Sequence, residues 1–215
     1  MSTSLAGQEY AYKRVIAEIH DLNWDHLRED EMISVAWSYY FFSIQFRENL
    51  QLACTLYSHD VNLRKLETEE CHTANLSPYP SVADAGERLN HDEFMRRLLC
   101  LSPITEKLEI EVKSIGHRYL EEIRGATPEI RALSISSYED GGLEMVFKGI
   151  LRAPTYENPL LNAFRFFLTE HIRFDSDPIN GHGGLSRHMA CDDRVLPLWV
   201  AFKRLLVVTT PSLIT

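Results

Sequence analysis

The sequence predicts an all-α protein folded as a single domain, and two observations support this fold class. Apolar residues recur at helical spacing through most of the chain, whereas alternating runs of the strand type, bounded by turn residues, are almost absent. The 215 residues, 45% of them hydrophobic and 25% charged, can bury a substantial core, and neither a repeat nor a long linker divides them. We therefore expect one domain over residues 1–215, built of seven or eight helices.

Start and stop signals place the expected helices along the chain. Their approximate ranges are 8–22, 29–57, 60–74, 81–100, 103–124, 127–152, a segment starting at Pro159, and 191–207. The dipeptides Ser102–Pro103 and Thr127–Pro128 each supply a cap followed by proline at the first helical position. Residues 37–46, WSYYFFSIQF, are so rich in aromatic side chains that their helix is expected to cross the core.

Charge and composition exclude several classes of partner. A net charge of −9 disfavours nucleic acid and anionic membrane surfaces, because binding to phosphate needs clustered lysine and arginine. No apolar run approaches the ~20 residues of a transmembrane helix. Residues 1–19 lack the continuous apolar core of a signal peptide, so we expect a cytoplasmic protein. The four cysteines show no CxxC spacing and are expected to be buried, reduced thiols.

The most informative stretch is the end of the helix that starts at Pro159. His171 and Asp175 are four residues apart, so on a helix they leave the same face and can converge on one ion. Pro178 and the glycines around His182 can break the helix and turn His182 toward the same point. An HxxxD pair alone is weak evidence, because such pairs are more often structural. Further ligands must come from elsewhere in the chain.

Candidate partners are carboxylates and imidazoles on other expected helices. Glu139 is followed by two glycines that would let a metal or substrate approach the backbone. The sequence is equally compatible with Glu139 as an ordinary surface residue. Glu69 and His72 have the ExxH spacing of carboxylate-bridged di-iron proteins, but solvated faces show this pattern too. Glu70 lies beside them, and His91 falls among apolar residues. Carboxylates with imidazoles and no paired thiolate suit iron better than structural zinc.

The order Glu, His, Glu, HxxxD and a final His on an aromatic-rich helical domain resembles the heme-oxygenase-like diiron oxidases. This superfamily is similar to thiaminase-II-like and pyrroloquinoline-quinone-synthase-like proteins, and the resemblance covers roughly residues 30–206. The metal ligands that it implies are Glu70, His91, Glu139, His171, Asp175 and His182. The pair Glu69 and His72 is an alternative to Glu70 and His91. His188 is an alternative to His182, because the segment SDPING lengthens the usual spacing after the aspartate.

The resemblance implies a heme-oxygenase-like bundle that binds Fe(II), two ions per chain or one, with O₂ as co-substrate. Such an enzyme oxidises a small organic substrate, an amine, an amino acid or a fatty acid, and the resemblance allows an external electron donor and a homodimer. Tyr39, Tyr40 and Phe42 are candidate pocket walls, although aromatic residues at helical spacing are more often core.

Three other functions remain open from the sequence. A metal-free enzyme of the thiaminase-II or quinone-synthase type would use the same residues for acid–base chemistry. A non-catalytic helical binding protein would place Glu139, His171 and Asp175 on separate surfaces. A heme oxygenase would use His20 or His26 as axial ligand and leave the later residues unexplained.

Overall fold

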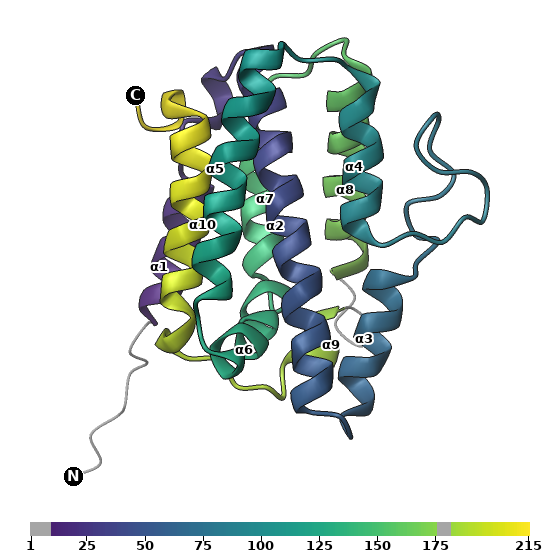
Figure 1. Cartoon of the computed structure of the whole chain (residues 1–215), viewed down its shortest axis with the longest axis vertical. Helices are drawn as coiled ribbons and strands as arrows, with labels where there is room; N and C mark the ends of the chain where they lie inside the picture. Colours follow the sequence, from purple (N-terminus) through teal and green to yellow (C-terminus); the bar gives the residue numbers. More distant parts are fainter. Residues whose placement is uncertain (1–9, 176–181) are drawn as a thin grey trace.

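The computed structural model describes residues 10–175 and 182–215, apart from the side chain of Asp175. Its described part is all-α, which confirms the predicted fold class, and it contains no strand, only the isolated bridges Thr73–Leu89 and Tyr79–Ala83 (Figure 1). The α-helices are α1 (Ala11–His20), α2 (Glu29–Leu56), α3 (Val61–Cys71), α4 (His91–Leu98), α5 (Glu106–Arg124), α6 (Pro128–Glu139), α7 (Gly142–Ile150), α8 (Pro159–Asp175), α9 (His182–Ser186) and α10 (Leu196–Thr209). Short 3₁₀ helices cover Trp24–His26, Leu99–Leu101, Asp193–Val195 and Pro211–Ile214.

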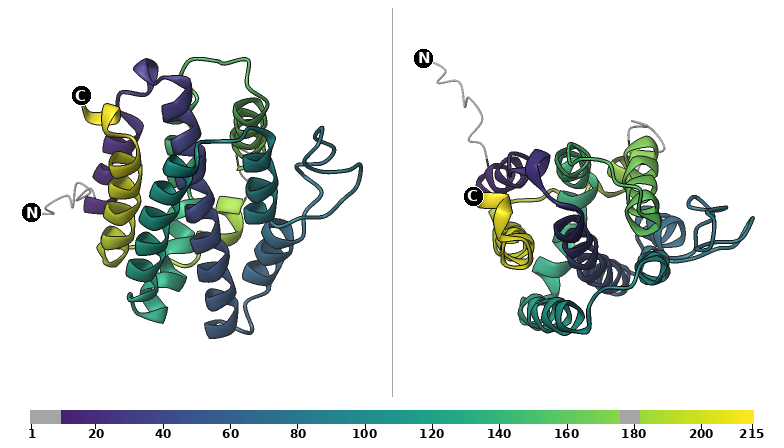
Figure 2. Two further views of the ribbon diagram at one scale, coloured as in Figure 1. Left: turned by 45° about the horizontal axis from the view of Figure 1, so that its top comes forward. Right: turned by 90° about the horizontal axis from the view of Figure 1, so that it is seen from above.

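Helix α2 is the centre of the fold. It packs against α3, α4, α5, α6, α8 and α10. In the views of Figures 1 and 2, α1, α5 and α10 lie on one side of α2, and α3, α4, α8 and α9 lie on the other. Buried residues follow one another almost without interruption from Met32 to Phe46, because α2 has no face turned fully to solvent.

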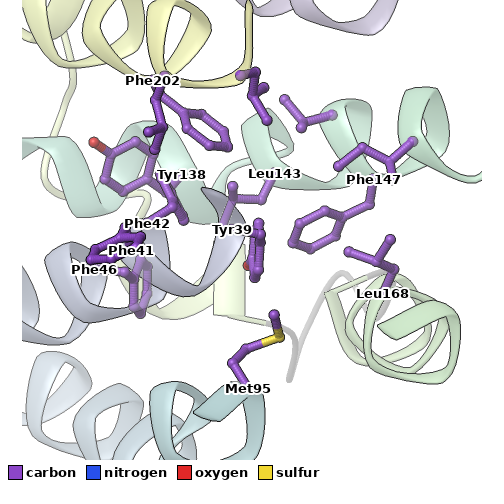
Figure 3. Close-up of a cluster of buried hydrophobic side chains, with 14 of the residues drawn as sticks. Tyr39, Phe41, Phe42, Phe46, Met95, Tyr138, Leu143, Phe147, Leu168 and Phe202 are labelled. Carbon is purple, nitrogen blue, oxygen red and sulfur yellow. The ribbon is translucent and has the colours of Figure 1, made fainter. Parts of the chain in front are cut away.

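The aromatic segment of α2 forms the middle of the core, as the sequence predicts (Figure 3). The ring of Phe42 lies 4.2 Å from that of Phe202 and 5.1 Å from that of Tyr138, measured between centroids. The ring of Tyr39 lies 5.4 Å from that of Phe147. These contacts join α2 to α6, α7 and α10 through aromatic surfaces, which contribute strongly to core stability when they are fully buried.

The described residues contain ten α-helices where seven or eight are expected, for identifiable reasons. The segment 127–152 forms two helices, α6 and α7, because Gly141 has a φ of 87° and ends the first. A short helix, α9, begins at His182, where a glycine-rich loop is expected. The expected helix 81–100 is confined to α4, and the residues before it belong to the loop that joins α3 to α4 and projects beside α4 in Figure 1.

Two other expectations are tested by the fold. No helix in the described part of the chain is both long and apolar enough to cross a membrane. All four cysteines are free, as expected, but only Cys54 is buried, and Cys100 is exposed.

Helix α5 approaches α2 closely at Gly116. A Cβ atom at this position would lie 2.2 Å from Cδ2 of Phe41, whose buried ring has no room to move away. The absence of a side chain therefore determines the distance between the two helices.

We predict that Gly116→Ala lowers the free energy of unfolding by roughly 1–2 kcal/mol, because overpacking outweighs the better helix propensity of alanine. Chemical denaturation measures the change. Ser114→Ala, at an exposed position of the same helix, is the matched control and should leave stability unchanged or slightly higher. A Gly116→Ala variant more stable than the wild type would show that α5 does not pack on Phe41 in this way.

Candidate metal centre

Five residues of the predicted ligand set lie together in the interior. They are Glu70, His91, Glu139, His171 and His182, and all five are buried. They come from five helices, α3, α4, α6, α8 and α9, so only the folded chain brings them together. Asp175, the sixth predicted residue, is the last residue of α8, one turn after His171, and its side chain lies outside the described part of the structure.

The cluster consists of two groups of three residues that share Glu70. In each group, one potential ligand atom per residue lies within 4.8 Å of the others. The first group contains Glu70, His91 and His171. Nδ1 of His91 lies 2.6 Å from Oε2 of Glu70 and 3.0 Å from Nε2 of His171.

The second group contains Glu70, Glu139 and His182. Nδ1 of His182 lies 2.8 Å from Oε1 of Glu70 and 3.3 Å from Oε2 of Glu139. The two oxygens of Glu70 therefore face different groups, Oε2 the first and Oε1 the second. A carboxylate in this position can bridge two metal ions.

Local structure holds the ligands of the first group in place. Nδ1 of His171 lies 2.8 Å from the carbonyl oxygen of Phe167, one turn earlier in α8. If Nδ1 carries the proton and donates it to this carbonyl, Nε2 presents its lone pair to His91 and Glu70. Beside His91, Asp92 accepts two hydrogen bonds, at 2.9 and 3.0 Å, from Nε of Arg47, which ties α4 to α2.

The second group depends on close contact between α6 and α9. Glu139 is the last residue of α6, and the left-handed conformation of Gly141 turns the chain directly after it. A Cβ atom at Gly183 would lie 2.9 Å from the backbone oxygen of Glu139, so a glycine is needed there. The glycine after Gly141, Gly142, packs against Trp199. Gly142 therefore allows close packing of helices. From the sequence, the two glycines were instead expected to let a metal or substrate approach the backbone.

Burial and charge keep the cluster in a state that suits a cation. Burial alone would raise the pKa of the Glu70 carboxyl, but the neighbouring His91 and His182 outweigh it and hold this pKa well below its usual value. Burial, with a smaller contribution from His91, lowers the pKa of His171 to about 3. The cluster therefore offers an ionised carboxylate and a neutral imidazole at neutral pH, the forms in which both residues bind metals.

The distances within the cluster also fit a metal site. Nitrogen and oxygen ligands about 2.1 Å from an ion in tetrahedral or octahedral geometry lie about 3.0–3.4 Å from one another. The separations of 2.6–3.3 Å given above are close to that range. In addition, the buried Oε1 of Glu70 lies 2.8 Å from another potential ligand atom, Nδ1 of His182, and a bound cation would hold both atoms.

The cluster borders a cavity of only about 10 Å³, about the size of one water molecule. Beyond the ligands it is lined by Tyr39, Ser43, Phe46 and Leu143. Of the predicted pocket walls, Tyr39 therefore lies at the site. Tyr40 lines a separate groove with Trp37, and Phe42 belongs to the core. Ser43, Phe46 and Leu143 were not predicted, because their residue types are equally common in any helical core.

The alternative ligands from the sequence lie elsewhere. His72 is exposed just after α3, and His188 is paired with Asp60. Glu69 lies outside both groups, although Oε2 of Glu69 is 3.7 Å from Nε2 of His182. The folded chain thus brings Glu70 and His91 together, instead of Glu69 and His72, and His182, not His188, lies in the cluster.

Comparisons with models of protein families, with curated proteins and with solved structures found no match.

We predict that the metal-free protein loses stability in acid partly through His171. Its pKa is lower in the folded than in the unfolded chain, so the folded state binds fewer protons between about pH 6.5 and 3. This contribution to stability is complete above pH 6.5 and is lost progressively below it, by about 1.4 kcal/mol at pH 5.5.

Urea unfolding of metal-free protein at pH 7.5 and 5.5 measures this loss. His171→Gln should remove that part of the pH dependence, whereas His59→Gln, at an exposed position, should retain it. The same pH dependence in His171→Gln and wild type would show that His171 is not buried as a neutral imidazole.

Proposed function

We propose that this protein is a non-heme diiron oxidase or oxygenase that activates O₂ to oxidise a small organic substrate. The observation that carries the proposal is the shared carboxylate: Glu70 belongs to two buried ligand groups at once. Two groups around one carboxylate suit a pair of ions, and a set of carboxylates and imidazoles without thiolates suits iron. The proposal includes the heme-oxygenase-like bundle as fold family, a cytoplasmic location and an external electron donor.

In this proposal each residue of the cluster has a defined task. His91 and His171 hold one ion, Glu139 and His182 hold the other, and Glu70 bridges them. Asp175 is the proposed sixth ligand, since it follows His171 by one turn of α8. When bound, the iron pair would supply the oxidising chemistry, which no protein side chain provides.

The surrounding side chains keep the site dry. The ring of Phe167 lies 4.1 Å from that of His171, and the ring of Phe147 lies 5.7 Å away, between centroids. Tyr39 covers the same side from α2, with its ring 5.4 Å from that of Phe167. Exclusion of water strengthens the attraction between ligands and ions and limits side reactions of an oxidising centre.

A metal-free acid–base enzyme of the thiaminase-II or quinone-synthase type is the second candidate. The observation that favours it is the chain of short contacts from Glu70 through His91 to His171, at 2.6 and 3.0 Å, along which a proton could move. A non-catalytic binding protein was expected to place Glu139 and His171 on separate surfaces. Both residues are instead buried in one cluster, which disfavours this alternative.

Metal stoichiometry tests the proposal. Protein loaded with Fe(II) under anaerobic conditions and then desalted should retain two irons per chain. Glu70→Ala should lose both, because the shared ligand serves each ion, whereas Glu139→Ala should retain one. Glu67→Ala, on the same helix and outside the cluster, should retain two.

Oxygen uptake then separates the two candidate enzymes. The Fe(II)-loaded wild type should consume O₂, and Glu70→Ala should not. A wild type that binds no divalent metal at micromolar concentration would exclude the diiron proposal and leave the acid–base enzyme. Equal iron contents in Glu70→Ala and Glu139→Ala would exclude the bridging role of Glu70.

A further inference from the structure

A cavity of about 440 Å³ lies between α1, the turn from α6 to α7, and the segment that follows α9. This volume falls within the range of ~300–1,000 Å³ that is typical of small-molecule sites. None of the five described residues of the metal cluster lines it. The cavity is therefore a separate candidate site, and its interpretation does not depend on the proposed metal centre.

A buried hydroxyl in the wall of this cavity points to a ligand. Ser136 of α6 lines the cavity and is only 3% exposed. Its neighbour Ser137 donates a hydrogen bond to the carbonyl of Ser134 and accepts one from Nε1 of Trp199. The hydroxyl of Ser136 makes no hydrogen bond to another described residue, so it is available to a molecule in the cavity.

Positive charge gathers at the same cavity, although the whole chain carries a net charge of −9. Lys13 of α1 lines the cavity and forms no ion pair with a described residue. Arg187, just after α9, lies 2.9 Å from Oδ1 of Asp140. Helix α7 begins beside the cavity at Gly141 and Gly142, and no side chain caps its first amides. Together these groups favour a ligand that carries a negative charge.

Apolar side chains form the rest of the wall. Ile16 is buried, whereas Tyr10 and Met145 are 43% and 37% exposed and would be covered by an occupant. The ring of Tyr10 stacks on that of Tyr12, with 5.7 Å between centroids. Aromatic rings and a thioether both favour contact with a flat apolar group.

The ordinary explanation of such a cavity is a surface hollow filled with water. The groove lined by Trp37 and Tyr40, of about 520 Å³, fits that explanation better. Its cations, Arg96 and Lys113, are each paired with a carboxylate of their own helix, from Glu93 and Glu109 respectively. Lys13 has no such partner among the described residues, and this difference singles out the cavity beside α1.

We propose that this cavity binds a small carboxylate with a flat apolar body. One unpaired cation suits a singly charged carboxylate better than a phosphate dianion. Lys13 neutralises the carboxylate, Ser136 supplies a buried hydrogen-bond donor, and Tyr12 and Met145 contact the apolar body.

Isothermal titration calorimetry of the full chain with 2-naphthoate tests the need for a negative charge. One molecule should bind per chain. The uncharged 2-naphthamide should bind roughly tenfold more weakly, because charge-assisted contacts are stronger than neutral ones.

Two variants test the residues that recognise the ligand. Lys13→Gln should weaken 2-naphthoate binding about fivefold, and Ser136→Ala about threefold. Arg14→Gln is the matched control, because it removes the same charge from the next residue of α1, which does not line the cavity. Its affinity should equal that of the wild type.

Thiol modification locates the bound molecule. Cys191 lines this cavity, whereas Cys100 lines the groove beside α4. Burial raises the pKa of Cys191 to about 11, so its alkylation by iodoacetamide is slow enough to follow by peptide mass spectrometry. Saturating 2-naphthoate should slow the alkylation of Cys191 and leave that of Cys100 unchanged.

Three results would overturn the proposal. No binding of 2-naphthoate at millimolar concentration would show that the cavity holds only water. Equal losses of affinity in Lys13→Gln and Arg14→Gln would reduce the effect of charge to a general attraction. Binding that leaves Cys191 unprotected would place the ligand elsewhere. Neither variant changes a residue of the metal cluster, so these outcomes are distinct from failure of the diiron proposal.

Discussion

The carboxylate of Glu70 is buried among imidazoles, and the arrangement of five helices depends on it. An ionised carboxylate in the interior is strongly destabilising unless opposite charges or a metal compensate it. His91 reaches one oxygen from α4 and His182 reaches the other from α9. The same contacts that neutralise Glu70 therefore draw α3, α4 and α9 together, and α6 and α8 complete the shell with Glu139 and His171.

Helix α2 supplies the other half of this arrangement. Its aromatic side chains pack against the helices on the other side of the core. Tyr39 connects the two regions, because its ring contacts that of Phe147 (Figure 3) and also that of Phe167. Such a wall has a lower dielectric constant than water, so charges in the cluster interact more strongly. The charge of Glu70 and the aromatic side chains of α2 thus act together: a polar cluster that could hold cations is enclosed by an apolar core.

Much of this arrangement could be predicted from the sequence, because helical periodicity and ligand order are local signals. Helical periodicity predicted the all-α fold, and the resemblance to the diiron oxidases implied the set Glu70, His91, Glu139, His171, Asp175 and His182, of which all but Asp175 lie in one buried cluster within the described residues. Periodicity could not distinguish Glu70 from Glu69, since two adjacent residues at the end of a helix differ only in which one faces inward. That difference is set by the packing of α9 on α3, a tertiary contact.

The helix boundaries that differ from expectation have a similar cause. The end of α6 depends on the φ of Gly141, whereas two glycines in a helical pattern are also compatible with a continuous helix. The short helix α9 lies in a segment of glycines with little helix propensity, and its contacts with α3 and α6 compensate for that weakness.

The central claim, that Glu70 bridges two ions, is tested most directly by a crystal structure of the Fe(II)-loaded protein with anomalous scattering recorded at the iron edge. The account predicts two iron peaks about 3.5–4 Å apart, one on each side of the Glu70 carboxylate, as in other two-metal sites. A single iron peak, or two peaks of which only one contacts Glu70, would contradict it.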